Sequence, residues 1–197
     1  MNPTGKAAPI DLASRAGVLA EVVATARFSD RSGQALDVEP AMAAIRAWLA
    51  ATKGSTATLY IVGNGGSAAV ASHAVTDFLN VGRLRATTLH EPSIMTCMAN
   101  DYGYEHAYAN MLGVLARPGD LLIAISSSGK SANILNAVRT MHDKAGTVFT
   151  LSGFAADNPL RALGDFNAWL DTTDYGEAEI GHQFILHNLA DRLRLGL

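Results

Sequence analysis

The sequence predicts one α/β domain, a three-layer sandwich whose central parallel sheet is covered by helices on both faces and preceded by N-terminal helices. The chain has 197 residues, which is the length of a single domain. Two uninterrupted apolar runs, at residues 58–62 and 121–125, are rich in β-forming residues, as in strands buried on both faces. Each run ends in a Gly- or Ser-rich loop followed by a helical pattern, the order typical of parallel sheets.

The first two expected elements are helices. Asp11 can cap a helix that runs to about Phe28, along which apolar residues recur at helical spacing. The same spacing returns in a second helix from Val38 to Leu49. Because both helices precede the first strand, we expect residues 1–52 to form a helical arm or an oligomer contact. Residues 57–197 are expected to form the α/β core, so that 1–197 is one domain.

The core is expected to alternate strands with helices. From the apolar runs, strands are expected at residues 58–62, 86–89, 121–125, 147–151 and 166–170. From the helical spacing, helices are expected at residues 67–79, from the Ser-rich loop to about 143, and from about 177 to 195.

Composition limits the functions that the chain can have. Charged residues make up 17% of it, where a soluble domain has roughly 25%. So few charges suggest that another subunit covers part of the surface. The net charge of −3 gives no basic surface for nucleic acid, and a hydrophobic content of 49% excludes a disordered chain. The single Cys97 excludes an internal disulfide and fits a reducing compartment.

The N-terminal residues 1–9 are polar and lack the apolar stretch of a signal peptide. No apolar run approaches the roughly 18 residues that span a bilayer. We therefore expect a cytoplasmic protein without a membrane partner.

The Gly-rich loop at residues 63–68 lies between an expected strand and an expected helix. Its glycines let the backbone approach a ligand, and the helix that follows presents free N–H groups. It also matches the dinucleotide pattern G-x-G-x-x-A, which needs an acidic residue about 20 positions on. Asp77 lies too early and Glu91 too late, which disfavours a nucleotide.

The Ser-rich loop at residues 126–131 is the stronger signal. Hydroxyl and backbone N–H groups at a helix start are donors suited to a phosphate monoester. The spacing of a Walker loop is absent. A Ser-rich turn in which Ser131 only caps a helix is the alternative. Four serines in six residues directly after a buried strand favour phosphate binding.

His73 and Asp77 are four residues apart in the helix that follows the Gly-rich loop, so they share one face. A His and a carboxylate at this spacing can ligate one metal ion, act as a base and its orienting partner, or form an ordinary surface contact.

The C-terminal helix has a polar stripe with a spacing of four residues. Its members are Glu179, Gln183, His187 and Asp191. Asp191 can orient the ring of His187, and the alternative for the whole stripe is a solvated face.

The other four histidines are considered separately from this stripe and from His73. His182 falls among leucines of the C-terminal helix and is expected to be buried. His90 and His142 are expected at the surface or in loops, and the sequence does not decide the place of His106.

Taken together, these residues resemble the phosphoheptose isomerases of the sugar-isomerase (SIS) domain superfamily, which has a flavodoxin-like fold. The resemblance covers nearly the whole chain. It rests on the helix ending at His187 and on the stretches Gly63–Ser67, Ala99–Tyr104 and Ile125–Asn133.

The resemblance implies a homotetramer with active sites shared between subunits, which converts sedoheptulose 7-phosphate to D-glycero-D-manno-heptose 7-phosphate for nucleotide-activated heptose. It implies one Zn²⁺ per subunit, with ligands at His73, Asp77, Glu179 and His187. It places phosphate and substrate contacts at Asn64, Gly65, Gly66, Ser67, Ser126, Ser127, Ser128 and Ser131, with Asn100 and Asp101 near the sugar.

Three positions depart from the family pattern. Asp77 stands where the family usually has Glu, Glu179 where it usually has Gln, and Val70 where relatives often have Asp or Asn. The two ligand changes keep the site able to bind metal but leave the sugar open, so another ketose phosphate is an alternative substrate.

For the mechanism, aldose–ketose isomerisation needs a base that moves a proton between C1 and C2 and an acid that serves the two oxygens. We assign the base to Asp77 or Glu179 and the acid/base partner to His187. A bound Zn²⁺ can polarise the carbonyl.

The spacing of Glu179 and His187 raises a difficulty, since eight residues rise roughly 12 Å along a helix. Either Glu179 precedes the first helical turn, or it serves a neighbouring subunit, or only one of the two binds.

Two other function classes compete with an isomerase. One is a non-catalytic tetrameric SIS protein that binds the replication initiator DnaA. Such proteins tend to lose the metal-binding and acid/base side chains, so the retained His73, Asp77, Glu179 and His187 favour an enzyme. The other is a phosphosugar sensor, which normally carries a DNA-binding module, and no basic helix is present.

Overall fold

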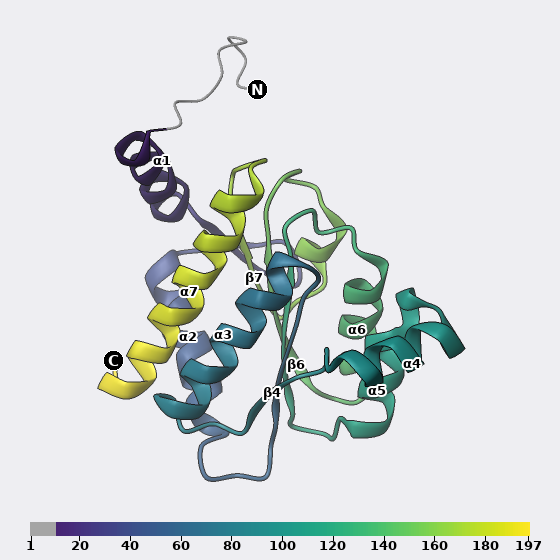
Figure 1. The fold of residues 1–197 in the computed structure, drawn as a ribbon. Helices are drawn as coiled ribbons and strands as arrows, with labels where there is room; N and C mark the ends of the chain where they lie inside the picture. The colour runs from purple at the N-terminus through teal and green to yellow at the C-terminus, as the bar shows by residue number, and fades with distance from the viewer. Residues whose placement is uncertain (1–10) are drawn as a thin grey trace.

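The computed structural model describes residues 11–197 and has the three layers expected (Figure 1). The polar N-terminal segment considered above therefore lies outside the described residues. The strands are β1 (Arg27–Asp30), β2 (Ala35–Leu36), β3 (Leu59–Val62), β4 (Ala86–Thr88), β5 (Leu121–Ser126), β6 (Thr147–Ser152) and β7 (Phe166–Trp169). The helices are α1 (Leu12–Ala24), α2 (Val38–Ala51), α3 (Gly66–Asn80), α4 (Pro92–Tyr102), α5 (Ala107–Leu115), α6 (Ala132–Asp143) and α7 (Tyr175–Leu195), with short 3-10 helices η1 (Tyr104–His106) and η2 (Pro159–Ala162).

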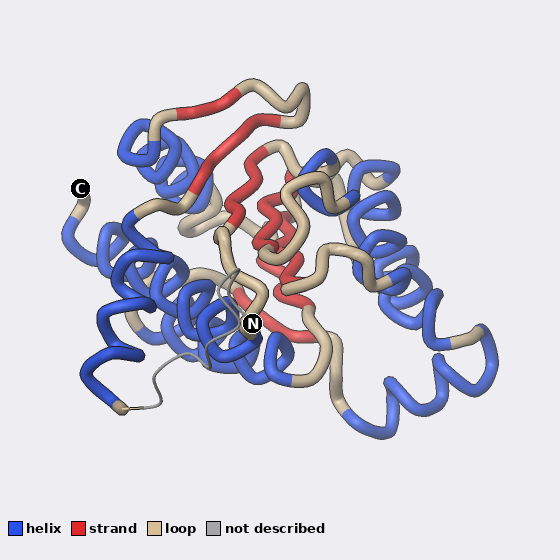
Figure 2. The backbone as a smooth tube through the Cα atoms, turned by 90° about the horizontal axis from the view of Figure 1, so that it is seen from above, coloured by secondary structure: helices blue, strands red, loops and turns tan. Residues whose placement is uncertain are grey.

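The sheet has seven strands in the order β2-β1-β7-β6-β5-β3-β4. The five strands from β7 to β4 are parallel, as predicted. Every residue of β3 and β5 is buried, because helices cover both faces of the sheet (Figure 2). All five strands predicted for the core are present.

Two apolar cores lie on the two faces of the sheet. On one face α2, α3 and α7 pack on side chains such as Ile61 and Ile123. On the other face α5 and α6 pack on the alternate side chains, such as Leu122 and Ala124. This alternation follows from the two-residue period of a strand.

The β1–β2 hairpin was not predicted. Asp11 caps α1 as expected, through a hydrogen bond from the backbone N–H of Ser14, but the helix ends at Ala24 rather than near Phe28. Residues 27–30 instead form β1, which pairs antiparallel with β7 and with β2. The helical spacing continued into Phe28 because that residue also packs into the core, which a strand achieves equally well.

A buried asparagine holds β1 against the parallel strands. Asn167 in β7 donates hydrogen bonds to the backbone oxygens of Ser29 and Asp30, and it accepts one from the hydroxyl of Thr150. Asn167 is 1% exposed, so the backbone groups it contacts have little access to water. These side-chain hydrogen bonds add to the antiparallel backbone pairing that joins β1 to β7.

The helices α4 and α5 were also not predicted. No residue of α4 is buried, and the helix projects from the body of the molecule (Figure 1). An element that buries no complete face leaves no clear helical spacing in the sequence, which is why pattern analysis missed it.

None of the helices between residues 11 and 197 is long and apolar enough to cross a bilayer.

His182 is buried in the core, as predicted. It is 0% exposed, and its Nε2 atom lies 3.1 Å from the backbone oxygen of Ser152 in β6. Burial lowers the pKa of His182 to about 4, because a charged imidazolium is poorly solvated there.

This burial predicts a pH dependence of stability. As the pH falls from 6.5 towards 4, unfolded His182 takes up a proton that the folded side chain does not, so the folded state loses stability. The free energy of unfolding should fall by up to about 1.4 kcal/mol per pH unit from this group. The free energy of unfolding, measured by urea denaturation at several pH values between 4.5 and 7.5, should change less with pH in His182→Gln than in the unchanged chain. The exposed His106 provides the control variant His106→Gln, and equal slopes in all three proteins would contradict the assignment.

Candidate functional site

A pocket of about 250 Å³ lies at the carboxyl ends of the parallel strands, between the first turns of α3 and α6. This edge of a parallel sheet is where ligands bind in α/β folds. The lining residues are Asn64, Gly65, Gly66, Ser67, Ile125, Ser126, Ser127, Ser128, Ser131, Tyr175 and Glu179. The fold thus brings both predicted loops to one pocket.

The Gly-rich loop connects β3 to α3. Gly65 has φ +53°, a left-handed conformation that favours glycine. Gly66 lies directly against the carboxylate of Glu179, and any Cβ atom there would overlap it. The glycines therefore let α3 start beside α7 with its first-turn N–H groups next to the pocket.

The Ser-rich loop connects β5 to α6. The side chain of Ser131 makes no capping hydrogen bond, so the alternative that it serves only as an N-cap is not supported. Its Oγ instead accepts a hydrogen bond from the Ser126 hydroxyl at 3.2 Å. The Ser127 hydroxyl is buried without a partner, which an oxyanion in the pocket would satisfy. The loop therefore offers hydroxyl donors to an anion, while Lys130 is exposed.

Two predicted substrate contacts are not at this pocket. Asn100 and Asp101 lie on α4, both exposed, and the Asn100 amide donates a hydrogen bond of 2.9 Å to the Asp101 carboxylate. Neither lines the pocket within one chain.

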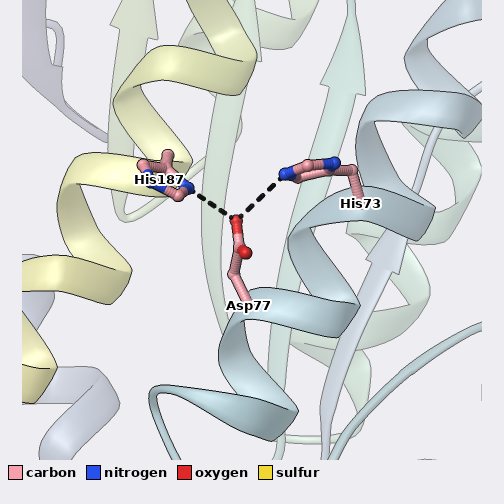
Figure 3. Close-up of side chains that lie close together, drawn as sticks. All are labelled: His73, Asp77 and His187. Atoms are coloured by element: carbon pink, nitrogen blue, oxygen red, sulfur yellow. Dashed lines mark hydrogen bonds and ion pairs between the residues drawn. The ribbon is translucent and has the colours of Figure 1, made fainter.

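A second group of polar side chains lies farther along α3 and α7. His73, Asp77 and His187 point toward one another across the two helices (Figure 3). The Asp77 carboxylate lies 2.9 Å from Nδ1 of His187 and 3.5 Å from Nε2 of His73. Among the described residues this is the one group of three or more His, Cys, Asp or Glu residues with mutually close ligand atoms.

Asp77 sets the electrostatics of this group. Its hydrogen bond with His187 raises the pKa of that imidazole, burial opposes the shift, and the negative charges of Asp77 and Asp191 reinforce it. Asp191 lies 3.8 Å from Nε2 of His187, on the far side of the ring. This distance is too long for a hydrogen bond, so the role of Asp191 in orienting His187 stays a prediction.

Glu179 does not join this group in a single chain. The helix α7 begins at Tyr175, so Glu179 lies inside it, and the possibility that it precedes the first turn is wrong. Its carboxylate faces Gly66 in the pocket between α3 and α6, roughly 12 Å along the axis from His187. The predicted set of four ligands is therefore reduced to three within one chain.

Tyr175 is a lining residue that sequence reasoning missed. It is the first residue of α7, and its ring packs edge-on against Phe154 with centroids 4.9 Å apart. Ile125, at the end of β5, was likewise missed as a lining residue. Nothing in the spacing of the sequence distinguishes either from an ordinary apolar residue.

His73, Asp77 and His187 fit a metal ion. Two imidazoles and one carboxylate are the donors of many catalytic zinc sites, which leave further positions open. Both histidine side chains are more than half exposed, at 57% and 55%, so the site is open to solvent.

Comparison with known proteins gives consistent matches. A family model described as the SIS domain matches residues 31–153. A phosphoheptose isomerase from Geotalea daltonii is 32% identical over 165 residues, which are 80% of this chain and 84% of that protein. One from Thiobacillus denitrificans is 35% identical over 139 residues, 66% of this chain and 70% of that protein. The solved phosphoheptose isomerase from Neisseria gonorrhoeae has a TM-score of 0.76 and 26% identity, covering 92% of this chain and 96% of its own.

The contact between Asp77 and His187 makes a testable prediction. In protein freed of metal by a chelator, the pKa of His187 should lie above its ordinary value, and Asp77→Asn should lower it. NMR titration of the histidine ring protons measures both. The variant Asp143→Asn, in a carboxylate that makes no ion pair among residues 11–197, is the control. If Asp77→Asn does not change the pKa of His187, the contact between the two residues is contradicted.

Proposed function

The chain belongs to the phosphoheptose isomerases of the SIS domain family, and we propose that it converts sedoheptulose 7-phosphate to D-glycero-D-manno-heptose 7-phosphate. The family consists of isomerase enzymes, and this chain is a sugar-phosphate isomerase. One observation supports the proposed reaction. The pocket between α3 and α6 and the His/Asp group both include residues of the helix pair α3 and α7.

The phosphate binds at the pocket between α3 and α6. The first turns of two helices and five serine residues line it. Helix N-termini stabilise anions through free N–H groups and the helix dipole. This end of the substrate does not react, so its role is to position the rest.

The reacting carbons lie near His187 and Asp77. In the forward direction a base removes a proton from C1, and the same proton is returned to C2. Meanwhile the C2 oxygen gains a proton and the C1 oxygen loses one, which conserves all atoms. We assign the acid role to His187, whose imidazole lies 2.9 Å from the Asp77 carboxylate. Asp77 is the favoured base, and Glu179 is the alternative.

His73, Asp77 and His187 would hold the zinc ion. When bound, Zn²⁺ supplies a Lewis acid that stabilises negative charge on the substrate oxygens. Glu179 is then a ligand only if a second copy supplies it.

The separation of the two groups suits an extended sugar phosphate. Glu179 marks the phosphate end and His187 the other, roughly 12 Å apart along α7. With C–C bonds of about 1.5 Å, an open seven-carbon chain with its phosphate reaches on the order of 10 Å.

We propose further that the active site is shared between subunits of a homotetramer. Ile180 and Phe184 are 54% and 59% exposed and lie on the same stretch of α7 as His187. With α1 they line an apolar hollow of about 490 Å³. A second copy that covers this surface would lie beside His187 and could supply the missing ligand. We take the single domain at residues 1–197 to be the unit that assembles.

Family membership decides between the competing function classes. The named relatives are enzymes, and the acid/base residues are assembled rather than lost. Both points favour an isomerase over a DnaA-binding scaffold or a phosphosugar sensor.

The direct test is an isomerisation assay. Purified protein should convert sedoheptulose 7-phosphate to the aldose, and a chelator should abolish turnover until Zn²⁺ is restored. Elemental analysis should find zinc in the active protein. Turnover that is indifferent to the chelator would refute the metal assignment, and no turnover would refute the proposed reaction.

Substitutions separate chemistry from phosphate binding. His187→Ala and Asp77→Asn should each lower kcat by about a hundredfold or more, while inorganic phosphate still competes with normal affinity. Glu179→Gln, which introduces the amide usual in relatives, should lower kcat less than Asp77→Asn. The exposed His106 gives the control His106→Ala. Unchanged turnover in His187→Ala would end its assignment.

A further inference from the structure

Asn64, in the Gly-rich loop, is held by two side chains from other parts of the fold. Its amide exchanges two hydrogen bonds with the amide of Asn133, at 2.9 and 2.8 Å. Its oxygen also accepts a hydrogen bond of 2.8 Å from the hydroxyl of Tyr104. Asn133 and Tyr104 lie 69 and 40 residues away in the sequence.

The orientation of both amides is fixed by the backbone. The Asn133 oxygen accepts the N–H of Ile134 at 3.0 Å, so its NH₂ group must face Asn64. That NH₂ group needs an acceptor, which turns the oxygen of Asn64 toward it. Asn133 is 2% exposed, so water cannot replace these partners.

This arrangement leaves Asn64 one way to contact a ligand. Its oxygen already accepts two hydrogen bonds, and one of its two N–H groups is used by Asn133. One side-chain N–H group is left over, and Asn64 lines the phosphate pocket. Asn64 can thus offer the pocket a donor but no acceptor, which suits a phosphate oxygen.

The Tyr104 segment is itself fixed on both sides. Gly103 has φ +82°, a conformation that favours glycine, and it turns the chain into η1. The amide of Asn136 in α6 donates to the backbone oxygen of Glu105, and the hydroxyl of Tyr108 donates to the backbone oxygen of Gly63. The segment therefore connects the start of α5 to both α6 and the Gly-rich loop.

We propose that Asn133 and Tyr104 are positioning residues, which set the spacing of the two phosphate-binding loops and the orientation of Asn64. Asn64 precedes α3, and Asn133 is the second residue of α6, so their paired amides join the two helix starts that flank the pocket. The proposal rests on the proposed function for the identity of the phosphate ligand.

Two variants and a control test it. Tyr104→Phe removes only a hydroxyl from a residue that is 48% exposed, so folding should be unaffected. Asn133→Leu keeps a side chain of similar size but removes the amide donor and acceptor groups. Tyr102→Phe is the control, because Tyr102 is similarly exposed at 55% and its hydroxyl makes no hydrogen bond to any residue between 11 and 197.

Calorimetric titration with inorganic phosphate and steady-state kinetics with sedoheptulose 7-phosphate give the readouts. We expect phosphate affinity to fall and KM to rise about threefold in Tyr104→Phe and about tenfold in Asn133→Leu, with kcat within about twofold. The double variant should lose less binding free energy for phosphate than the two single variants lose in sum, since both act through Asn64. Affinity and KM equal to those of Tyr102→Phe would overturn the proposal.

Hydrogen exchange separates this proposal from the proposed function. Peptides covering residues 63–68 and 126–131 should exchange faster in both variants, with exchange elsewhere unchanged. This result requires no turnover, so an inactive protein would refute the isomerase while leaving the loop measurement valid. Unchanged exchange in these peptides, or faster exchange throughout the chain, would overturn the positioning role.

Discussion

The packing of α3 against α7 is the contact on which both halves of the candidate site depend. Both helices start at the same edge of the sheet and run side by side, with their apolar faces in one core. Near their starts the carboxylate of Glu179 lies against Gly66, and farther along Asp77 meets His187. A bulkier residue at Gly66 would displace the carboxylate of Glu179 from its place against the start of α3.

The two halves of the candidate site differ in the charged groups that they contain. Among the described residues that line the pocket between α3 and α6 there is no Lys or Arg, so its donors are hydroxyl groups, the side-chain amide of Asn64 and backbone N–H groups. The pocket also holds one carboxylate, Glu179, which a phosphate dianion would repel. In the His/Asp group the charged partners are concentrated around Asp77. The pocket contributes uncharged donors and one carboxylate, whereas the His/Asp group contributes two imidazoles and a carboxylate. This difference suits the proposed reaction, in which only the far end of the substrate changes.

Side chains from other parts of the fold hold the Gly-rich loop in place. The Gly-rich loop would be free to move if its glycines were its only feature, since glycine lowers the barrier to other conformations. Paired amides of Asn64 and Asn133 and the hydroxyl of Tyr104 remove that freedom. The stretches around residues 99–104 and 125–133, which carried the family resemblance, thereby acquire a physical role beyond direct contact with substrate.

The sequence by itself determined the parallel core, the two loops at the strand ends and the pair of His73 and Asp77 on one helix face, because each depends on spacing within a short segment. It also identified His182 as buried. Only the tertiary structure decided which distant residues meet. It brought His187 to Asp77, placed Glu179 with the phosphate pocket instead, and put β1 beside β7 through Asn167. Such contacts depend on how helices and strands pack across the sheet. The spacing of residues within one short segment does not indicate which distant segment will pack against it.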